Sequence, residues 1–298
     1  MILTTSSRLL LTDYLEAGAS PRPYLGGRYN LLPFISQSKV EQIPSQVSIT
    51  STRNQARDAE EFDGTEQTAA GYLMAEIFAG SKLYLLPGIR YEYTSSDYTG
   101  RQVLFASNGA HLSTTPVGSK TNYGIALPAL HVKYAVTPQT NLRFAVTRSF
   151  ARPNYYDLVP YEARNDVDNT VALGNTGLNP TTSWNVDVLG EHYFKSNGVV
   201  SGGVFYKRLA NYIYQFTYAQ PINNVIYQYR QPLNGDEATI RGVEVALQNQ
   251  LTFLPSPLDG LGVYANYTFS DSSASFPHHA GDSTLPGQSK HIGNVALS

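Results

Sequence analysis

Residues 83–94 read LYLLPGIRYEYT, and this stretch decides the fold. Its odd positions carry apolar or aromatic side chains, interrupted by one proline: Leu83, Leu85, Pro87, Ile89, Tyr91 and Tyr93. Its even positions lead to the polar residues Arg90, Glu92 and Thr94. A period of two indicates a β-strand whose side chains point alternately into an apolar and a polar environment. A run of about 12 residues is roughly 40 Å long, and when tilted near 45° it covers about 28 Å of bilayer.

Similar runs recur along the chain in pairs. The pairs are 68–79 with 83–94, 122–136 with 141–149, 183–194 with 199–217, and 239–253 with 261–271. Short stretches of turn-forming residues separate the members of each pair, at 80–82, 137–140, 195–198 and 254–260. Long polar connections join successive pairs, at 95–121, 150–182, 218–238 and 272–289, and a ninth run begins at Lys290. This alternation of short turns and long loops is typical of a transmembrane β-barrel.

We therefore predict an all-β fold, an antiparallel meander of about nine or ten strands that forms part of a large transmembrane β-barrel. Val186, Val188, Val263 and Ala265 are expected to face lipid. Aromatic residues gather near the ends of the runs, where the girdles of an outer-membrane barrel lie. The alternation alone also fits a large soluble antiparallel sheet with one covered face, and the asymmetry of turns and loops favours the barrel.

The composition suits a sheet with one wet face and one apolar face. The 298 residues include 22 Tyr and 12 Phe, and only 15% are charged. Lys and Arg number 21 against 23 Asp and Glu, so the net charge is −2 and no basic excess indicates a nucleic-acid partner. The absence of Cys excludes disulfides, thiolate metal sites and a cysteine nucleophile.

The first 67 residues lack this rhythm, so we divide the chain into a poorly defined segment, 1–67, and barrel strands, 68–298. The features expected in the first segment are a short helix or loop at 7–17, a strand that ends near Phe34 and a polar loop around 53–64. No apolar core of a secretory signal occurs near the start. We expect the export signal to lie upstream of Met1.

Two motifs carry a family resemblance. Residues 148–161 read RSFARPNYYDLVPY, and residues 174–187 read GNTGLNPTTSWNVD. Together they resemble the barrel domain of TonB-dependent outer-membrane receptors, in which R-S-x-A-R-P-x-Y leaves one strand and G-N-P-x-L-x-P-x-x-S-x-N enters the next. Further similar segments are AGYLMAEI at 70–77, LPGIRYEYT at 86–94, GGVFYKRLANYIY at 202–214 and IRGVEVALQ at 240–248. One departure is Thr176, where the family usually has Pro.

The resemblance covers about residues 66–298, and it implies an architecture, a location, partners and a function for the protein. Such receptors have 22-stranded barrels that are filled by an N-terminal plug. The resemblance implies that the chain is an internal piece of a receptor in the outer membrane of a Gram-negative bacterium. It implies two partners, membrane lipid and the TonB complex. The TonB complex would act through a plug domain that is not present in this chain. The implied function is TonB-energised import of a large scarce nutrient, such as a ferric siderophore, cobalamin or an oligosaccharide, without enzymatic activity or a cofactor. A passive porin and a secreted carbohydrate-active β-protein are the alternatives.

The long loop at 150–182 is the expected place of ligand contact, through Tyr155, Tyr156 and Arg164. Only the long loops have enough chain to fold over the mouth of a barrel. We expect them to face the outside of the cell and the short turns to face the periplasm.

Three sets of residues resemble metal or catalytic sites, and in each a plainer explanation is favoured. His278, His279, Asp282 and His291 read as a solvated loop, because adjacent residues of an extended chain point in opposite directions. Asp166, Asp168 and Asn169 lack the downstream glycine and glutamate of a calcium loop. Glu191 and Glu244 read as lining of a barrel lumen rather than as paired catalytic carboxylates. No metal ligand or catalytic residue is assigned.

Overall fold

The computed structural model describes residues 2–4, 22–24, 29–31, 35–42, 50–52, 55–106, 110–195, 198–252, 254–256, 258–277, 281 and 283–298. Contacts between residues divide the chain into two units, Met1–Arg57 and Asp58–Ser298. Among the described residues, no helix is long and apolar enough to cross a membrane.

The first unit contains short elements. Strand β1 (Ile2–Thr4) pairs with β4 (Thr50–Thr52), and β2 (Arg22–Tyr24) pairs with β3 (Tyr29–Leu31). Helix α1 spans Gln37–Glu41. The helix-or-loop segment expected at 7–17 and the strand end expected near Phe34 lie outside the described residues. Part of the polar loop expected around 53–64 is ordered, as a 3₁₀ helix at Gln55–Glu60 and the start of a strand at Asp63.

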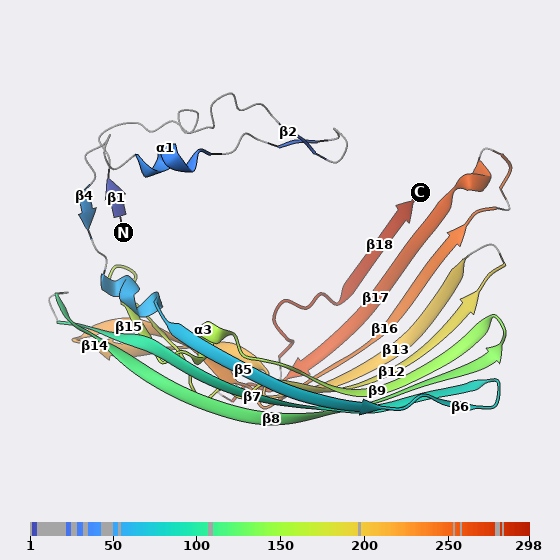
Figure 1. Cartoon of the computed structure of the whole chain (residues 1–298), viewed down its shortest axis with the longest axis horizontal. Helices are drawn as coiled ribbons and strands as arrows, with labels where there is room; N and C mark the ends of the chain where they lie inside the picture. Colours follow the sequence, from blue (N-terminus) through green and yellow to red (C-terminus); the bar gives the residue numbers. More distant parts are fainter. Residues whose placement is uncertain are drawn as a thin grey trace. The chain divides into compact units, whose positions relative to one another are not determined.

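The second unit is built on a 14-stranded sheet. Its long meander consists of β5 (Asp63–Met74), β6 (Ile77–Ala79), β7 (Leu83–Phe105), β8 (His111–Thr137), β9 (Thr140–Ala151), β12 (Thr181–Tyr193), β13 (Val199–Ala210), β16 (Glu237–Gln250), β17 (Gly262–Ala274) and β18 (His291–Leu297). Figure 1 shows the long strands from β7 to β18 side by side, and each of them pairs antiparallel with the next, while β5 and β6 both pair antiparallel with β7. Because β5 and β6 form one interrupted strand along β7, the described meander has nine strands, which agrees with the predicted number of about nine or ten.

The two faces of this sheet differ in chemistry. A directly paired row across seven strands is entirely apolar: Leu85, Val132, Phe144, Val188, Val204, Val243 and Phe269. We call this side the apolar face; the opposite side, which carries Glu92, Arg143 and Glu191, is the polar face. Val204 is 53% exposed on the apolar face, and the described part of the second unit places no other sheet against it. The predicted alternation of apolar and polar faces is confirmed, and among the described residues no second sheet packs on the apolar face of these strands.

The loops predicted at 95–121 and 218–238 are wrong, because both stretches are mostly strand. Residues 95–121 are mostly strand, because β7 continues to Phe105 and β8 begins at His111. The stretch is rich in Ser and Thr, yet Ser96 and the preceding Thr94 are buried on the polar face and the pairing with β8 continues. The run predicted at 199–217 is two strands, since β13 ends at Ala210 and β14 spans Ile213–Ile222.

Strand β15 (Val225–Asn234) pairs with β14 in a hairpin that replaces the loop predicted at 218–238. Its two turn residues, Asn223 and Asn224, have φ of 50° and 67°. Two consecutive positive φ values define a turn whose twist matches a hairpin, and asparagine tolerates them. The Asn-Asn pair was therefore a hairpin signal in the sequence.

The connection after β9 is also ordered. It contains helix α3 (Tyr155–Leu158) and strands β10 (Glu162–Asn165) and β11 (Thr170–Leu173). Strand β10 pairs parallel with β7, and β11 pairs parallel with β15, so the loops extend the sheet. Long connections thus meet at one end of the meander, which we call the loop end; the turns around 80–82 and 138–139 lie at the turn end.

Candidate functional site

Three connections at the loop end form one structured region. We call the described residues of 152–180, 211–236 and 275–290 the loop layer. Its first apolar core combines a strand residue with loop residues: Tyr98, Leu158, Val159, Tyr161 and Leu178. A second core joins Tyr212 to Ala238 and Ala274, with Phe276 packed against them. The long connections are therefore held by cores of their own, and side chains on them have defined positions.

Arg152 fixes the start of the loop layer. It follows β9 directly, and its guanidinium forms an ion pair with the Glu92 carboxylate. Its Nε lies 3.5 Å from Oε1 of Glu66, and Nη2 of Arg90 lies 2.7 Å from Oε2 of Glu92. Pro153, which lacks a ladder N–H, follows and lets the chain leave the sheet. The R-P part of the first motif thus ends a strand and ties the loop to β5 and β7.

Asparagines of the second motif join the connections to one another. Asn175 donates its backbone N–H to the Asp157 carbonyl at 2.7 Å and its side-chain N–H to the Pro232 carbonyl at 2.9 Å. The Asn179 backbone N–H donates to Oδ1 of Asn234 at 2.8 Å. These bonds hold 152–180 against the β14–β15 hairpin. Thr176, at the family's usual Pro position, is exposed in the intervening turn.

The three predicted contact residues all lie in the loop layer but have different surroundings. Tyr155 is 52% exposed, with its ring centroid 6.4 Å from that of Tyr98. Tyr156 is half-buried and stacks on Tyr161 at 4.2 Å. Arg164 forms an ion pair with Asp166, donates to the Tyr227 hydroxyl at 2.8 Å and lies over the Tyr227 ring. Tyr155 is therefore the most exposed of the three.

Burial shifts the titration of this layer. Desolvation raises the pKa of the Tyr156 and Tyr161 hydroxyls further above physiological pH. Desolvation also raises the pKa of the Asp157 carboxyl, whose charged form is disfavoured in α3.

The β14–β15 hairpin adds aromatic residues that the sequence interpretation missed. Tyr218 and Tyr229 are directly paired, with ring centroids 5.2 Å apart and an interplanar angle of 17°. Phe216 stacks on Tyr218 at 5.5 Å. All three rings are half-buried, on one face of the hairpin. The alternation in YQFTYAQ at 214–220 was the available signal, hidden because this stretch straddles a predicted strand and a predicted loop.

The residues considered for metal binding have other contacts where they are described. No group of three or more His, Asp or Glu among the described residues is arranged to hold a metal ion. His278, His279 and Asp282 lie outside those residues, and Nδ1 of His291 lies 2.7 Å from the Tyr267 hydroxyl. Asp168 accepts from the Asn165 amide within its own turn. Glu191 pairs with Arg143, at 2.9 Å between Nε and Oε2.

Comparison with known proteins supports one family. The family described as TonB dependent receptor-like, beta-barrel, matches residues 4–298. No curated protein matches the chain.

Three similar solved structures illustrate the fold. They are the copper transporter OprC (15% identity, TM-score 0.59, covering 79% of this chain and 33% of that one), the siderophore receptor PiuA from Acinetobacter baumannii (16%, 0.55, 79% and 31%), and a double mutant of the Serratia marcescens hemophore receptor HasR with HasA and heme (14%, 0.59, 84% and 44%). The chain therefore spans a third to under half of the length of these proteins, and at such identities the likeness concerns the fold alone.

Proposed function

Because the chain belongs to the TonB-dependent receptor family, we propose that it forms part of the barrel of an outer-membrane receptor that imports a large scarce nutrient. Members of this family are outer-membrane transporters or receptors of Gram-negative bacteria rather than enzymes. In this proposal the energy comes from the TonB complex, acting through a plug domain.

The observation that carries the proposal is the opposition of the two faces. Val188, Val204 and Val243 form an exposed apolar row. Contact of this row with lipid is favourable, whereas its contact with water costs free energy. On the polar face, the structured loop layer occupies one end of the same strands. A lipid-facing exterior and a structured mouth are the parts that a receptor barrel needs.

The proposed ligand is a ferric siderophore, cobalamin or an oligosaccharide, held by the loop layer. The similar solved structures include the ferric citrate transporter FecA and the siderophore receptor PiuA, which supports the ferric class. We propose that Tyr155, Tyr156 and Arg164 contribute to recognition, together with the half-buried rings of Phe216, Tyr218 and Tyr229 on the hairpin.

Uptake in cells tests the function. A strain that lacks the receptor regains uptake of a radiolabelled ferric siderophore when the receptor is restored, and this uptake requires an intact TonB complex. Uptake that persists without TonB would indicate a passive porin. Recovery of the receptor in the aqueous phase of a detergent extraction, rather than with outer membranes, would favour the secreted carbohydrate-active alternative.

Epitope tags test the orientation. Val167 is 91% exposed in the loop layer, so a tag inserted there should bind antibody on intact cells. A tag at 196–197, between β12 and β13, should bind only after the cells are permeabilised. Labelling of the second tag alone on intact cells would invert the proposed direction of every strand.

A further inference from the structure

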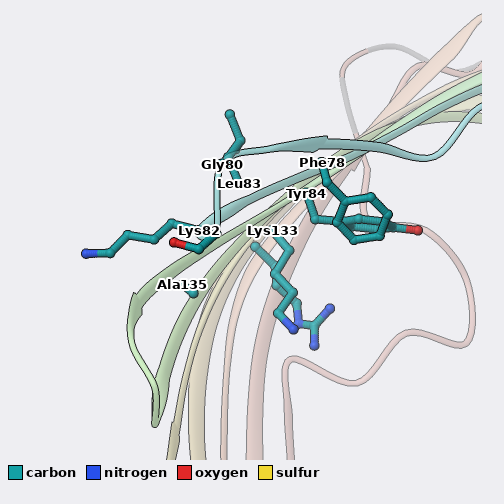
Figure 2. Close-up of a pocket in the computed structure, with 9 residues that line it drawn as sticks. Phe78, Gly80, Lys82, Leu83, Tyr84, Lys133 and Ala135 are labelled. Carbon is teal, nitrogen blue, oxygen red and sulfur yellow. The ribbon is translucent and has the colours of Figure 1, made fainter.

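The turn end of the polar face carries two cations in direct opposition. Strand pairing places Phe78 opposite Tyr84, Tyr84 opposite Lys133, and Lys133 opposite Arg143. These four residues line a pocket of about 420 Å³, which Figure 2 shows from the side of the β6–β7 turn. The rings of Phe78 and Tyr84, with centroids 5.0 Å apart, form one wall of it.

Directly opposed like charges destabilise a sheet, because paired Cβ atoms lie only about 5 Å apart. Arg143 has one compensating group, the Glu191 carboxylate at 2.9 Å. Lys133 forms no ion pair within the described part of the chain, although it is half-buried. The repulsion at this register position is therefore only partly offset by the protein itself.

The remaining charges nearby do not remove the imbalance. Lys82 also lines the pocket, and in Figure 2 its side chain extends away from Lys133. Asp187 and His131 line an adjoining pocket of about 200 Å³ that shares Lys133 and Arg143. Asp187 lies one row further along β12 and forms no ion pair with either cation. The lining of the first pocket includes three cations and two aromatic rings, and none of its residues is acidic.

We propose that this pocket binds one oxyanion, a carboxylate or phosphate group, between Lys133 and Arg143. The Lys133 ammonium supplies up to three donors, and the guanidinium of Arg143 has N–H groups beyond the Nε that Glu191 occupies. The half-buried ring of Tyr84 covers part of one side, and less access of water strengthens a charge-assisted hydrogen bond. The proposal concerns the protein's own charges and does not depend on which nutrient is imported.

Two sources can supply this chemistry, a free anion or a carboxylate of another segment of the receptor. Thermal unfolding of the full-length receptor in detergent separates them, measured in chloride with and without inorganic phosphate. The variants are Lys133→Met, which keeps the apolar stem and removes the charge, and Lys133→Arg, which keeps a cation. Lys207→Met is the matched control, because Lys207 is a half-buried cation on the same face whose paired neighbours are Asn185 and Ile240.

A free anion predicts that phosphate raises the Tm of the wild type, Lys133→Arg and Lys207→Met by about 2 °C and leaves Lys133→Met unchanged. A carboxylate of the receptor predicts no response to phosphate, but a lower Tm for Lys133→Met than for Lys133→Arg or Lys207→Met. A further outcome is that Lys133→Met fails to assemble while Lys207→Met assembles. In that case assembly of Lys133→Arg supports the site, and failure of both Lys133 variants to assemble refutes it. The proposal is overturned if the Tm of Lys133→Met rises or stays unchanged and phosphate has no effect. That result is expected when no anion lies between Lys133 and Arg143 and the substitution only removes their repulsion.

Discussion

Arg152 connects the loop layer to strands that lie far earlier in the sequence. Its partner Glu92 is only 7% exposed, so the carboxylate depends on nearby cations for compensation. Arg90 remains beside Glu92 when Arg152 is removed, which limits the loss. The motif arginine is thus a structural tie between β9 and β7, and it orders the residues that follow it.

Arg152→Met should lower the free energy of unfolding of the loop layer by about 2 kcal/mol, because Glu92 loses a charge-assisted bond. Hydrogen exchange of the amides at 155–161 measures this loss. The matched control is Arg208→Met, because the exposed pair of Arg208 with Glu237 is screened by water and should contribute little to stability. Equal exchange in the two variants would contradict the role of Arg152.

Asp157→Asn should stabilise α3. Because burial raises the pKa of the Asp157 carboxyl in the folded state, its charge opposes folding above that pKa, and the opposition disappears as the pH falls through it. The variant should therefore increase the protection of the Leu158 and Val159 amides at pH 7 and abolish the gain that the wild type shows on acidification. Asp166→Asn should instead destabilise the turn that contains it, because the Asp166 carboxylate forms an ion pair with Arg164 and accepts a hydrogen bond from the Tyr227 hydroxyl.

At the level of elements, the sequence predicted strands well where one face is apolar. In β7, alternation is clear from Leu83 to Tyr93 and fades at Ser95, Ser96 and Asp97, where both faces are polar. The strand nevertheless continues, because its edge pairs with β8 and the loop layer covers Tyr98. Hydrophobic periodicity locates the part of a strand that has one apolar face and does not locate the end of the strand.

The candidate site was predictable in part for the same reason. Tyr155, Tyr156 and Arg164 were found because the motif marked a long loop, and all three lie in the loop layer. Their separate environments depend on pairings between distant segments, such as β11 with β15, which no local pattern encodes. The Phe216, Tyr218 and Tyr229 stack requires the register of the β14–β15 hairpin, and so it was missed.

The turn of that hairpin is a test at this scale. Asn224 has φ of 67°, where a β-branched side chain is strongly disfavoured. Asn224→Val should destabilise the hairpin by about 1–2 kcal/mol, whereas Asn224→Gly should be tolerated or slightly stabilising. Limited proteolysis between residues 213 and 234 compares the two variants. Faster cleavage of the glycine variant would contradict the positive φ at this turn.

For the whole molecule, the central question is which solvent covers the apolar face. Val204 lies on β13 in the middle of the apolar row and is 53% exposed, so an arginine there meets no packed neighbour. In a soluble sheet this substitution would be mild. In a barrel, an arginine facing the middle of the bilayer costs about 2–4 kcal/mol, whereas a lumen position tolerates the charge.

Val204→Arg should therefore reduce the amount of folded receptor in outer membranes, measured by the heat-dependent shift of the barrel in gel electrophoresis. Ser201→Arg is the control, because Ser201 lies on the polar face of the same strand, directly opposite Glu191. An arginine there gains an acidic neighbour and should leave assembly unchanged. If both variants assembled equally, the apolar face would be in contact with water or with another protein surface, and the soluble-sheet alternative would be correct. The comparison isolates the solvent, since the two positions share a strand, a substituted side chain and a distance of only three residues.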